Sequence, residues 1–173
     1  MISSVYIHIP FCNNICNYCN FTKFYYHEKS VQDYLKALKK EIEKRYQGEI
    51  IKTLYIGGGT PSCLNLNELN ELFKILEIFK LSSEVEFTIE VNPESLTKEK
   101  IKLFKEKKVN RISMGVESTN NKHLNYLGRS HDFFLVKEKI KLLKEEDFRN
   151  INVDLIYALE NQSLIDLEKD IDN

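Results

Sequence analysis

Three cysteines, Cys12, Cys16 and Cys19, lie close together near the start of the sequence in the pattern C-x3-C-x2-C. Three thiolates can hold three irons of a [4Fe-4S] cluster and leave the fourth iron without a protein ligand, whereas an electron carrier normally supplies four cysteines. An iron without a protein ligand can bind a chelating small molecule. The pattern therefore predicts a cluster with one open iron.

Two other uses of these cysteines stay open at this point. A structural zinc site needs four nitrogen or sulfur ligands, and His8 or Cys63 could complete such a set. The thiols could also be packed and inert, although Asn13, Asn14 and Asn17 make this segment a polar loop. For Cys63 itself, we expect packing as a small apolar residue.

The elements that must position this loop alternate between short β-branched runs and longer amphipathic runs. We expect strands at residues 5–9, 53–56, 85–91, 111–116 and 151–156. The intervening helices are expected to begin at Ser30, Asn65, Thr97 and Asp132. Alternating strands and helices predict a parallel sheet with right-handed crossovers. The cysteines then follow the first strand, at the sheet edge where α/β proteins place their sites.

The faces of the expected strands differ in polarity. In four of them apolar residues alternate with polar ones, and Glu90 and Asp154 fall on the polar face. A doubly wound sheet is buried on both faces and should be apolar on both. We therefore predict a partial (β/α) TIM-like barrel, with helices on the convex face and a polar ligand on the concave face. The alternative is that these polar side chains only bind one another.

A glycine turn, Gly57, Gly58 and Gly59 followed by Thr60 and Pro61, comes after the second strand. It lacks the lysine and spacing of a P-loop, so phosphate binding is not predicted. Glycines allow the backbone to approach a ligand closely and to offer its N–H and C=O groups. A plain tight turn is the alternative.

Composition limits the class of protein. The chain has 173 residues and a net charge of -1, from 25 basic and 26 acidic residues, so we expect one domain over residues 1–173 and no nucleic acid partner. The apolar run at residues 5–11 is far shorter than the roughly 20 residues of a spanning helix. No charged signal region precedes it. We therefore expect a cytoplasmic protein without an integral membrane segment.

The motifs YIHIPFC at 6–12, CNYC at 16–19 and GGGTP at 57–61 resemble the radical S-adenosylmethionine (SAM) superfamily. Within it the chain is similar to the oxygen-independent coproporphyrinogen III oxidase group. The resemblance continues through IEVNPE at 89–94, ISMGVES at 112–118, LGR at 127–129 and VDLI at 153–156. The oxidases proper carry a further cysteine two residues after the triplet, where this chain has Phe21. This departure indicates the haem chaperone branch.

The resemblance implies that Cys12, Cys16 and Cys19 hold a [4Fe-4S] cluster whose open iron chelates SAM. It also implies a set of SAM-binding residues: Tyr6, Tyr18, Gly58, Gly59, Thr60, Glu90, Glu117, Arg129 and Asp154. Loop packing for Tyr18 and a surface charge for Arg129 stay open as alternatives. His8 is a candidate catalytic residue, and a satisfied hydrogen bond is its alternative. The implied partners are haem or another tetrapyrrole and a protein that reduces the cluster.

Two departures affect these expectations. Glu117 stands where the family usually has glutamine, which places an acid near the expected cofactor. Family members also continue beyond the position of Asn173, so we expect five of six strands, a truncated core domain and no C-terminal domain. Three functions follow as possibilities: a haem chaperone, a coproporphyrinogen III dehydrogenase that uses a 5'-deoxyadenosyl radical for oxidative decarboxylation, and a non-catalytic truncated remnant.

Overall fold

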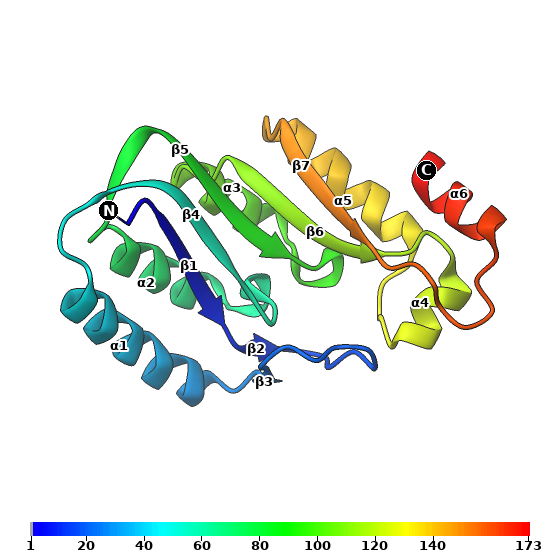
Figure 1. Ribbon diagram of the computed structural model, residues 1–173, viewed down its shortest axis with the longest axis horizontal. Helices are drawn as coiled ribbons and strands as arrows, with labels where there is room; N and C mark the ends of the chain where they lie inside the picture. Colours follow the sequence, from blue (N-terminus) through cyan, green and yellow to red (C-terminus); the bar gives the residue numbers. More distant parts are fainter. Residues whose placement is uncertain (1) are drawn as a thin grey trace.

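The computed structural model describes residues 2–173 and contains one five-stranded parallel sheet in the order β1-β4-β5-β6-β7 (Figure 1). Its strands are β1 (Ser4–Ile9), β4 (Ile50–Gly58), β5 (Lys80–Val91), β6 (Arg111–Glu117) and β7 (Asn150–Leu155). The sheet is open, with β1 and β7 at its edges. The five predicted strands and their parallel arrangement are confirmed.

Helices connect successive strands of the sheet. The connecting helices are α1 (Glu28–Arg45), α2 (Leu66–Leu76), α3 (Lys98–Glu106) and α5 (Phe133–Glu145). A short helix, α4 (Asn121–Leu127), follows β6, and α6 (Leu164–Asp172) follows β7. Two 3-10 turns, η1 (Pro61–Cys63) and η2 (Pro93–Ser95), and two short paired strands, β2 (Phe11–Cys12) and β3 (Phe24–Tyr25), lie near the strand ends.

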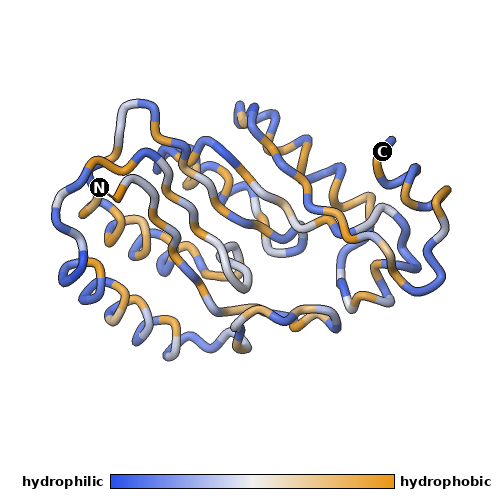
Figure 2. Tube along the Cα trace, viewed as in Figure 1, coloured by the Kyte–Doolittle hydropathy of each residue, from blue (hydrophilic) through white to orange (hydrophobic). Residues whose placement is uncertain are grey.

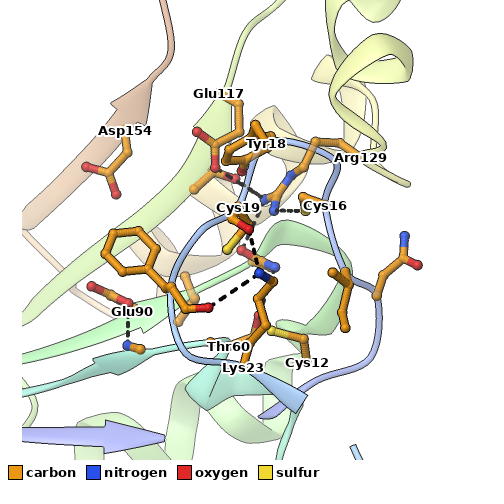
Figure 3. Close-up of a pocket in the computed structure, with 18 of the residues that line it drawn as sticks. Cys12, Cys16, Tyr18, Cys19, Lys23, Thr60, Glu90, Glu117, Arg129 and Asp154 are labelled. Atoms are coloured by element: carbon orange, nitrogen blue, oxygen red, sulfur yellow. Dashed lines mark hydrogen bonds and ion pairs between the residues drawn. The ribbon is translucent and has the colours of Figure 1, made fainter. Parts of the chain in front are cut away.

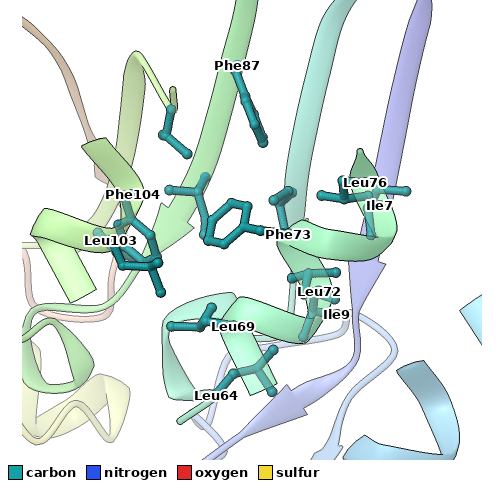
Figure 4. Packing of buried hydrophobic residues seen from close by; sticks show 14 of the residues in the cluster. Ile7, Ile9, Leu64, Leu69, Leu72, Phe73, Leu76, Phe87, Leu103 and Phe104 are labelled. Carbon is teal, nitrogen blue, oxygen red and sulfur yellow. The ribbon is translucent and has the colours of Figure 1, made fainter. Parts of the chain in front are cut away.

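One face of the sheet carries the hydrophobic core. Ile9, Ile56, Ile89 and Ile112 are fully buried there, against apolar side chains of all four connecting helices. Figure 4 shows part of this packing around Phe73 of α2. Along α1, apolar and polar residues alternate at helical spacing (Figure 2), and the apolar ones face the sheet. The opposite face of the sheet therefore keeps the polar residues of the same strands.

The helix starts follow local capping chemistry in three of four cases. Asn65 forms a capping box with Glu68, and the side chains of Thr97 and Asp132 each accept a hydrogen bond from a backbone N–H of the first turn. The prediction for Ser30 is wrong, because α1 begins at Glu28 without a side-chain cap. This helix is therefore held by the packing of its apolar face and not by a side-chain cap.

Two strands are longer than predicted. β4 begins three residues earlier than expected and β5 five residues earlier. The added part of β5 is mostly polar and exposed, so it lacks the apolar alternation that reveals a half-buried strand.

Within residues 2–173, no helix has both the length and the apolar character to cross a membrane.

Candidate functional site

A cavity of about 530 Å³ opens at the carboxyl ends of the strands. Its lining includes most of the residues singled out from the sequence: Cys12, Cys16, Tyr18, Cys19, Gly58, Gly59, Thr60, Glu90, Glu117, Arg129 and Asp154. Figure 3 shows Glu90 and Asp154 on the strands and Cys16, Tyr18 and Cys19 on the loop across the cavity. Residues far apart in the sequence are thus brought into one cavity.

The cysteine loop (residues 12–23) is fixed at its base and in its middle by backbone and side-chain hydrogen bonds. Pairing of β2 with β3 closes its base, where the N–H of Tyr26 donates to the carbonyl of Cys12 at 2.8 Å. At its far side the N–H of Asn17 donates to the carbonyl of Leu127 at 3.1 Å, next to Gly128. Gly128 has φ +75°, and a Cβ there would lie 3.2 Å from the Asn17 side chain. The end of α4 therefore positions the middle of the loop.

The glycine turn presses against the first cysteine. A Cβ on Gly59 would lie 2.8 Å from the carbonyl oxygen of Phe11 and 2.9 Å from Sγ of Cys12, so a side chain would not fit. The N–H of Thr60 donates to the same carbonyl at 2.8 Å, and its hydroxyl donates to Sγ of Cys12 at 3.4 Å. Close backbone approach is therefore observed, and it brings this turn into contact with the cysteine loop.

Arg129 is the buried cation of the site, with 7% of its surface exposed. Its guanidinium donates to Oδ1 of Asn92 at 3.0 Å, to the carbonyl of Gly115 at 2.6 Å and to Sγ of Cys16 at 3.5 Å. Burial opposes its charge, but the carboxylate of Glu94 and the contact with Cys16 raise its pKa. The surface-charge interpretation is therefore wrong. Its Nε has no hydrogen-bond partner within residues 2–173.

Three carboxylates face the same cavity. Glu90 accepts from the hydroxyl of Tyr55 at 2.8 Å and from the N–H of Gly58 at 3.0 Å. Burial raises the pKa of Glu90 despite these hydrogen bonds. Burial likewise raises the pKa of Glu117, whose Oε1 lies 3.9 Å from Arg129. Asp154 accepts from Ser113 at 3.1 Å. Carboxylates beside one guanidinium suit a ligand that carries both a positive and a negative group.

Tyr6 and His8 of β1 lie outside the cavity lining. Nε2 of His8 lies 2.9 Å from the carbonyl of Thr22, and its Nδ1 lies 3.3 Å from the hydroxyl of Tyr6. These contacts agree with the satisfied-hydrogen-bond interpretation of His8. Its catalytic role stays a prediction.

Cys63 is separate from the three site cysteines. Its side chain is 7% exposed within the hydrophobic core, and its thiol donates to the carbonyl of Phe11 at 3.3 Å. Burial raises the pKa of this thiol to about 12. The expected apolar packing is confirmed.

In residues 2–173, no three His, Cys, Asp or Glu side chains are close enough to form a ready metal-ion site.

Four residues in or next to the site were not identified from the sequence, namely Lys23, Asn92, Glu94 and His131. Nδ1 of His131 lies 3.3 Å from Oε2 of Glu94, its Nε2 lies 3.2 Å from the carbonyl of Val116, and its side chain is fully buried. Asn92 holds Arg129, and Nζ of Lys23 donates to the carbonyl of Cys19 at 2.5 Å. A signal existed for two of them, because Asn92 and Glu94 lie in the IEVNPE motif. Lys23 and His131 carried none.

Comparison with known proteins agrees with this geometry. The profile of the Radical SAM superfamily matches residues 6–173. The chain is 40% identical to Heme chaperone HemW of Bacillus subtilis over 98% of its length, and 33% identical to oxygen-independent coproporphyrinogen III oxidase of Escherichia coli over 92%. It spans 46% of the former protein and 36% of the latter.

Solved structures show the same fold. The structure of coproporphyrinogen III oxidase HemN from Escherichia coli superposes with a TM-score of 0.89 and 30% identity, over 98% of this chain and 40% of that one. Native anSMEcpe with bound AdoMet matches with a TM-score of 0.59 at 16% identity, which shows the fold alone. Fold and site together define a radical SAM core. The chain belongs to the radical SAM superfamily, and its relatives include HemW and oxygen-independent coproporphyrinogen III oxidase.

Proposed function

We propose that the chain binds a [4Fe-4S] cluster through Cys12, Cys16 and Cys19 and binds SAM beside it, as a radical SAM protein of haem metabolism. The observation that carries the proposal is the cavity that these three cysteines share with Arg129. The residues fit the two groups. Three thiols leave one iron open, and the buried Nε of Arg129 still needs an acceptor.

The residues around the cavity suit different polar groups of SAM. Arg129 suits its carboxylate, while Glu90 and Asp154 suit its ammonium group or ribose hydroxyls. The backbone at Gly58, Gly59 and Thr60 adds donors and acceptors close to the cysteines. When bound, the reduced cluster supplies the electron that cleaves the sulfonium bond of SAM.

A single structural zinc ion receives less support than the cluster. The two candidates for its fourth ligand are engaged elsewhere. Cys63 lines a different cavity and donates to the carbonyl of Phe11, and Nε2 of His8 lies within hydrogen-bond distance of the carbonyl of Thr22. Zinc would need one of them to complete its tetrahedral set.

A role as haem chaperone is the finer part of the proposal. It is supported by the 40% identity to Heme chaperone HemW and by Phe21, which is 71% exposed and lines the cavity where the oxidases proper add a cysteine. Coproporphyrinogen III oxidation is the second candidate, favoured by the TM-score of 0.89 to HemN. The proposed place of action is the cytoplasm, with a separate protein that reduces the cluster.

Anaerobic reconstitution tests the cofactors. We expect about four irons and four sulfides per chain, lost in Cys16→Ser and retained in Cys63→Ser, and a change in the electron paramagnetic resonance signal when SAM is added. Stoichiometric zinc without sulfide would overturn the proposal. Haem binding without conversion of coproporphyrinogen would support the chaperone, and measured conversion would support the oxidase.

A further inference from the structure

The side chain of Asn92 lies between two groups that donate to the site cysteines. Its Nδ2 donates to Oγ1 of Thr60 at 3.2 Å, and its Oδ1 accepts from the guanidinium of Arg129 at 3.0 Å. The hydroxyl of Thr60 in turn donates to Sγ of Cys12 at 3.4 Å, and Arg129 donates to Sγ of Cys16 at 3.5 Å. We call these four hydrogen bonds the Asn92 network. One amide therefore joins two donor groups that reach different sulfurs.

The chemistry of these groups fixes the direction of the hydrogen bonds. A guanidinium has N–H donors and no acceptor, so the atom of Asn92 that faces Arg129 must be the amide oxygen. The amide nitrogen then faces Thr60 and occupies a lone pair of its hydroxyl oxygen. The hydroxyl proton of Thr60 is thereby left to point at Sγ of Cys12. The amide of Asn92 thus orients a donor without contacting the sulfur itself.

A structural role in its own turn does not explain the side chain of Asn92. The residue precedes η2, but its side chain does not cap that turn. Other groups hold its backbone, because its N–H donates to Oγ of Ser62 at 3.0 Å and its carbonyl accepts from the N–H and the hydroxyl of Ser95, both at 3.1 Å. Thr60 and Arg129 are also only 6% and 7% exposed, so water has little access to replace the amide between them.

We propose that Asn92 is a positioning residue that raises the reduction potential of the cluster by orienting the donors to Cys12 and Cys16. This inference rests on the proposed function, which places the cluster on these cysteines. Hydrogen bonds to the sulfurs are among the factors that set the potential of an iron–sulfur cluster. A donor stabilises the reduced form more than the oxidised form, because reduction adds negative charge. The Asn92 network should therefore make the cluster easier to reduce.

Redox titration of the anaerobically reconstituted protein, followed by electron paramagnetic resonance, tests the proposal. We expect Asn92→Leu to keep about four irons per chain and to lower the one-electron reduction equilibrium constant about tenfold, which corresponds to about 59 mV. Thr60→Val, which removes one donor and keeps the shape of the side chain, should lower the potential by a smaller amount. The double variant should shift less than the sum of the two single variants, because Asn92 acts partly through Thr60.

Ser95→Ala is the matched control. Its hydroxyl contacts the backbone carbonyl of Asn92 and, among the described residues, hydrogen-bonds to no cysteine, so the potential should stay unchanged. If Asn92→Leu fails to fold, Asn92→Ala removes the same amide without adding bulk.

Three outcomes would overturn this inference and leave the cofactor proposal intact. They are an unchanged potential in the Asn92 variant, an equal shift in Ser95→Ala, and additive shifts in the double variant with Thr60→Val. An unmutated protein that binds zinc without sulfide would overturn the cofactor proposal and this inference together.

Discussion

The two walls of the cavity are built in different ways. The arginine wall consists of Asn92, Glu117 and Arg129, which line the cavity, together with Glu94 and His131, which do not line it but contact this group. It is largely buried and joined by side-chain hydrogen bonds. The cysteine loop opposite is anchored by backbone pairs and by side-chain hydrogen bonds of Asn14 and Asn17 to the end of α4, and Cys16 and Cys19 are only partly buried. Within residues 2–173, the fold therefore buries most of the arginine wall and leaves only Nε of Arg129 without a partner there, whereas it leaves Cys16 and Cys19 of the loop partly exposed to a bound group.

The largest effect should follow from removal of that bound group. We expect Cys16→Ser to lower the iron content from about four per chain to near zero, because the cluster loses one of three ligands. Amide hydrogen exchange should then rise in residues 12–23 and stay unchanged at Arg129 and His131. Cys63→Ser is the control for cluster content. Equal exchange in the loop with and without the cluster would show that its backbone contacts suffice.

Loss of the buried cation should have the next largest effect, on the other wall. Arg129→Met leaves the carboxylates of Glu94 and Glu117 in the wall without their common cation. We expect the free energy of unfolding to fall by about 3–5 kcal/mol, as when one partner of a buried ion pair is removed. Urea denaturation measures it. Arg149→Met, at an exposed arginine, should stay within about 0.5 kcal/mol, and an equally small change for Arg129→Met would refute a preformed wall.

The contact between Glu94 and His131 allows a pH test of the same wall. Burial alone would raise the pKa of Glu94, but the hydrogen bond from His131 and the charge of Arg129 outweigh it and lower that pKa. A lowered pKa in the folded state stabilises the protein above the unfolded value of about 4.3, and this contribution disappears as the pH falls through the folded value.

We therefore expect Glu94→Gln to lower the free energy of unfolding at pH 7 by about 1–2 kcal/mol and to have a smaller effect below about pH 4. Thermal unfolding at the two pH values measures the difference. Glu145→Gln, at an exposed position of α5, serves as the control. A cost that is the same at both pH values would show that the contact is steric rather than electrostatic.

The contrast between the walls also explains what the sequence could reveal. Cys12, Cys16 and Cys19 are recognisable because their chemistry depends on spacing along the chain, and Glu90 follows from alternation along one strand. His131 was missed because its partners, Glu94 and the carbonyl of Val116, belong to other elements. A lone histidine carries no periodic signal. Such contacts depend on strand register and on the bulge in β6 between Gly115 and Glu117, neither of which is visible in residue types.

The smallest expected effect concerns Glu117 of the arginine wall. Burial raises the pKa of this carboxylate although Arg129 opposes the shift, so its charged form destabilises the folded protein above the folded pKa. Glu117 has φ +68°, a strain that glutamine would share, so Glu117→Gln changes charge with the backbone kept. We expect the variant to gain up to about 1 kcal/mol at pH 8 and nothing at pH 4.

The same substitution should strengthen SAM binding a few-fold, because it removes a negative charge from the region where Arg129 would hold the cofactor's carboxylate. Calorimetric titration of SAM into the reconstituted protein measures this, with Glu90→Gln as the matched comparison. Hydrogen bonds from Tyr55 and Gly58 hold the Glu90 carboxylate in the cavity, where it suits the ammonium group or ribose hydroxyls of SAM. Glu90→Gln should therefore weaken SAM binding instead. If Glu117→Gln also weakened binding, Glu117 would hold the ammonium group of SAM, and the assignment of that group to Glu90 would be wrong.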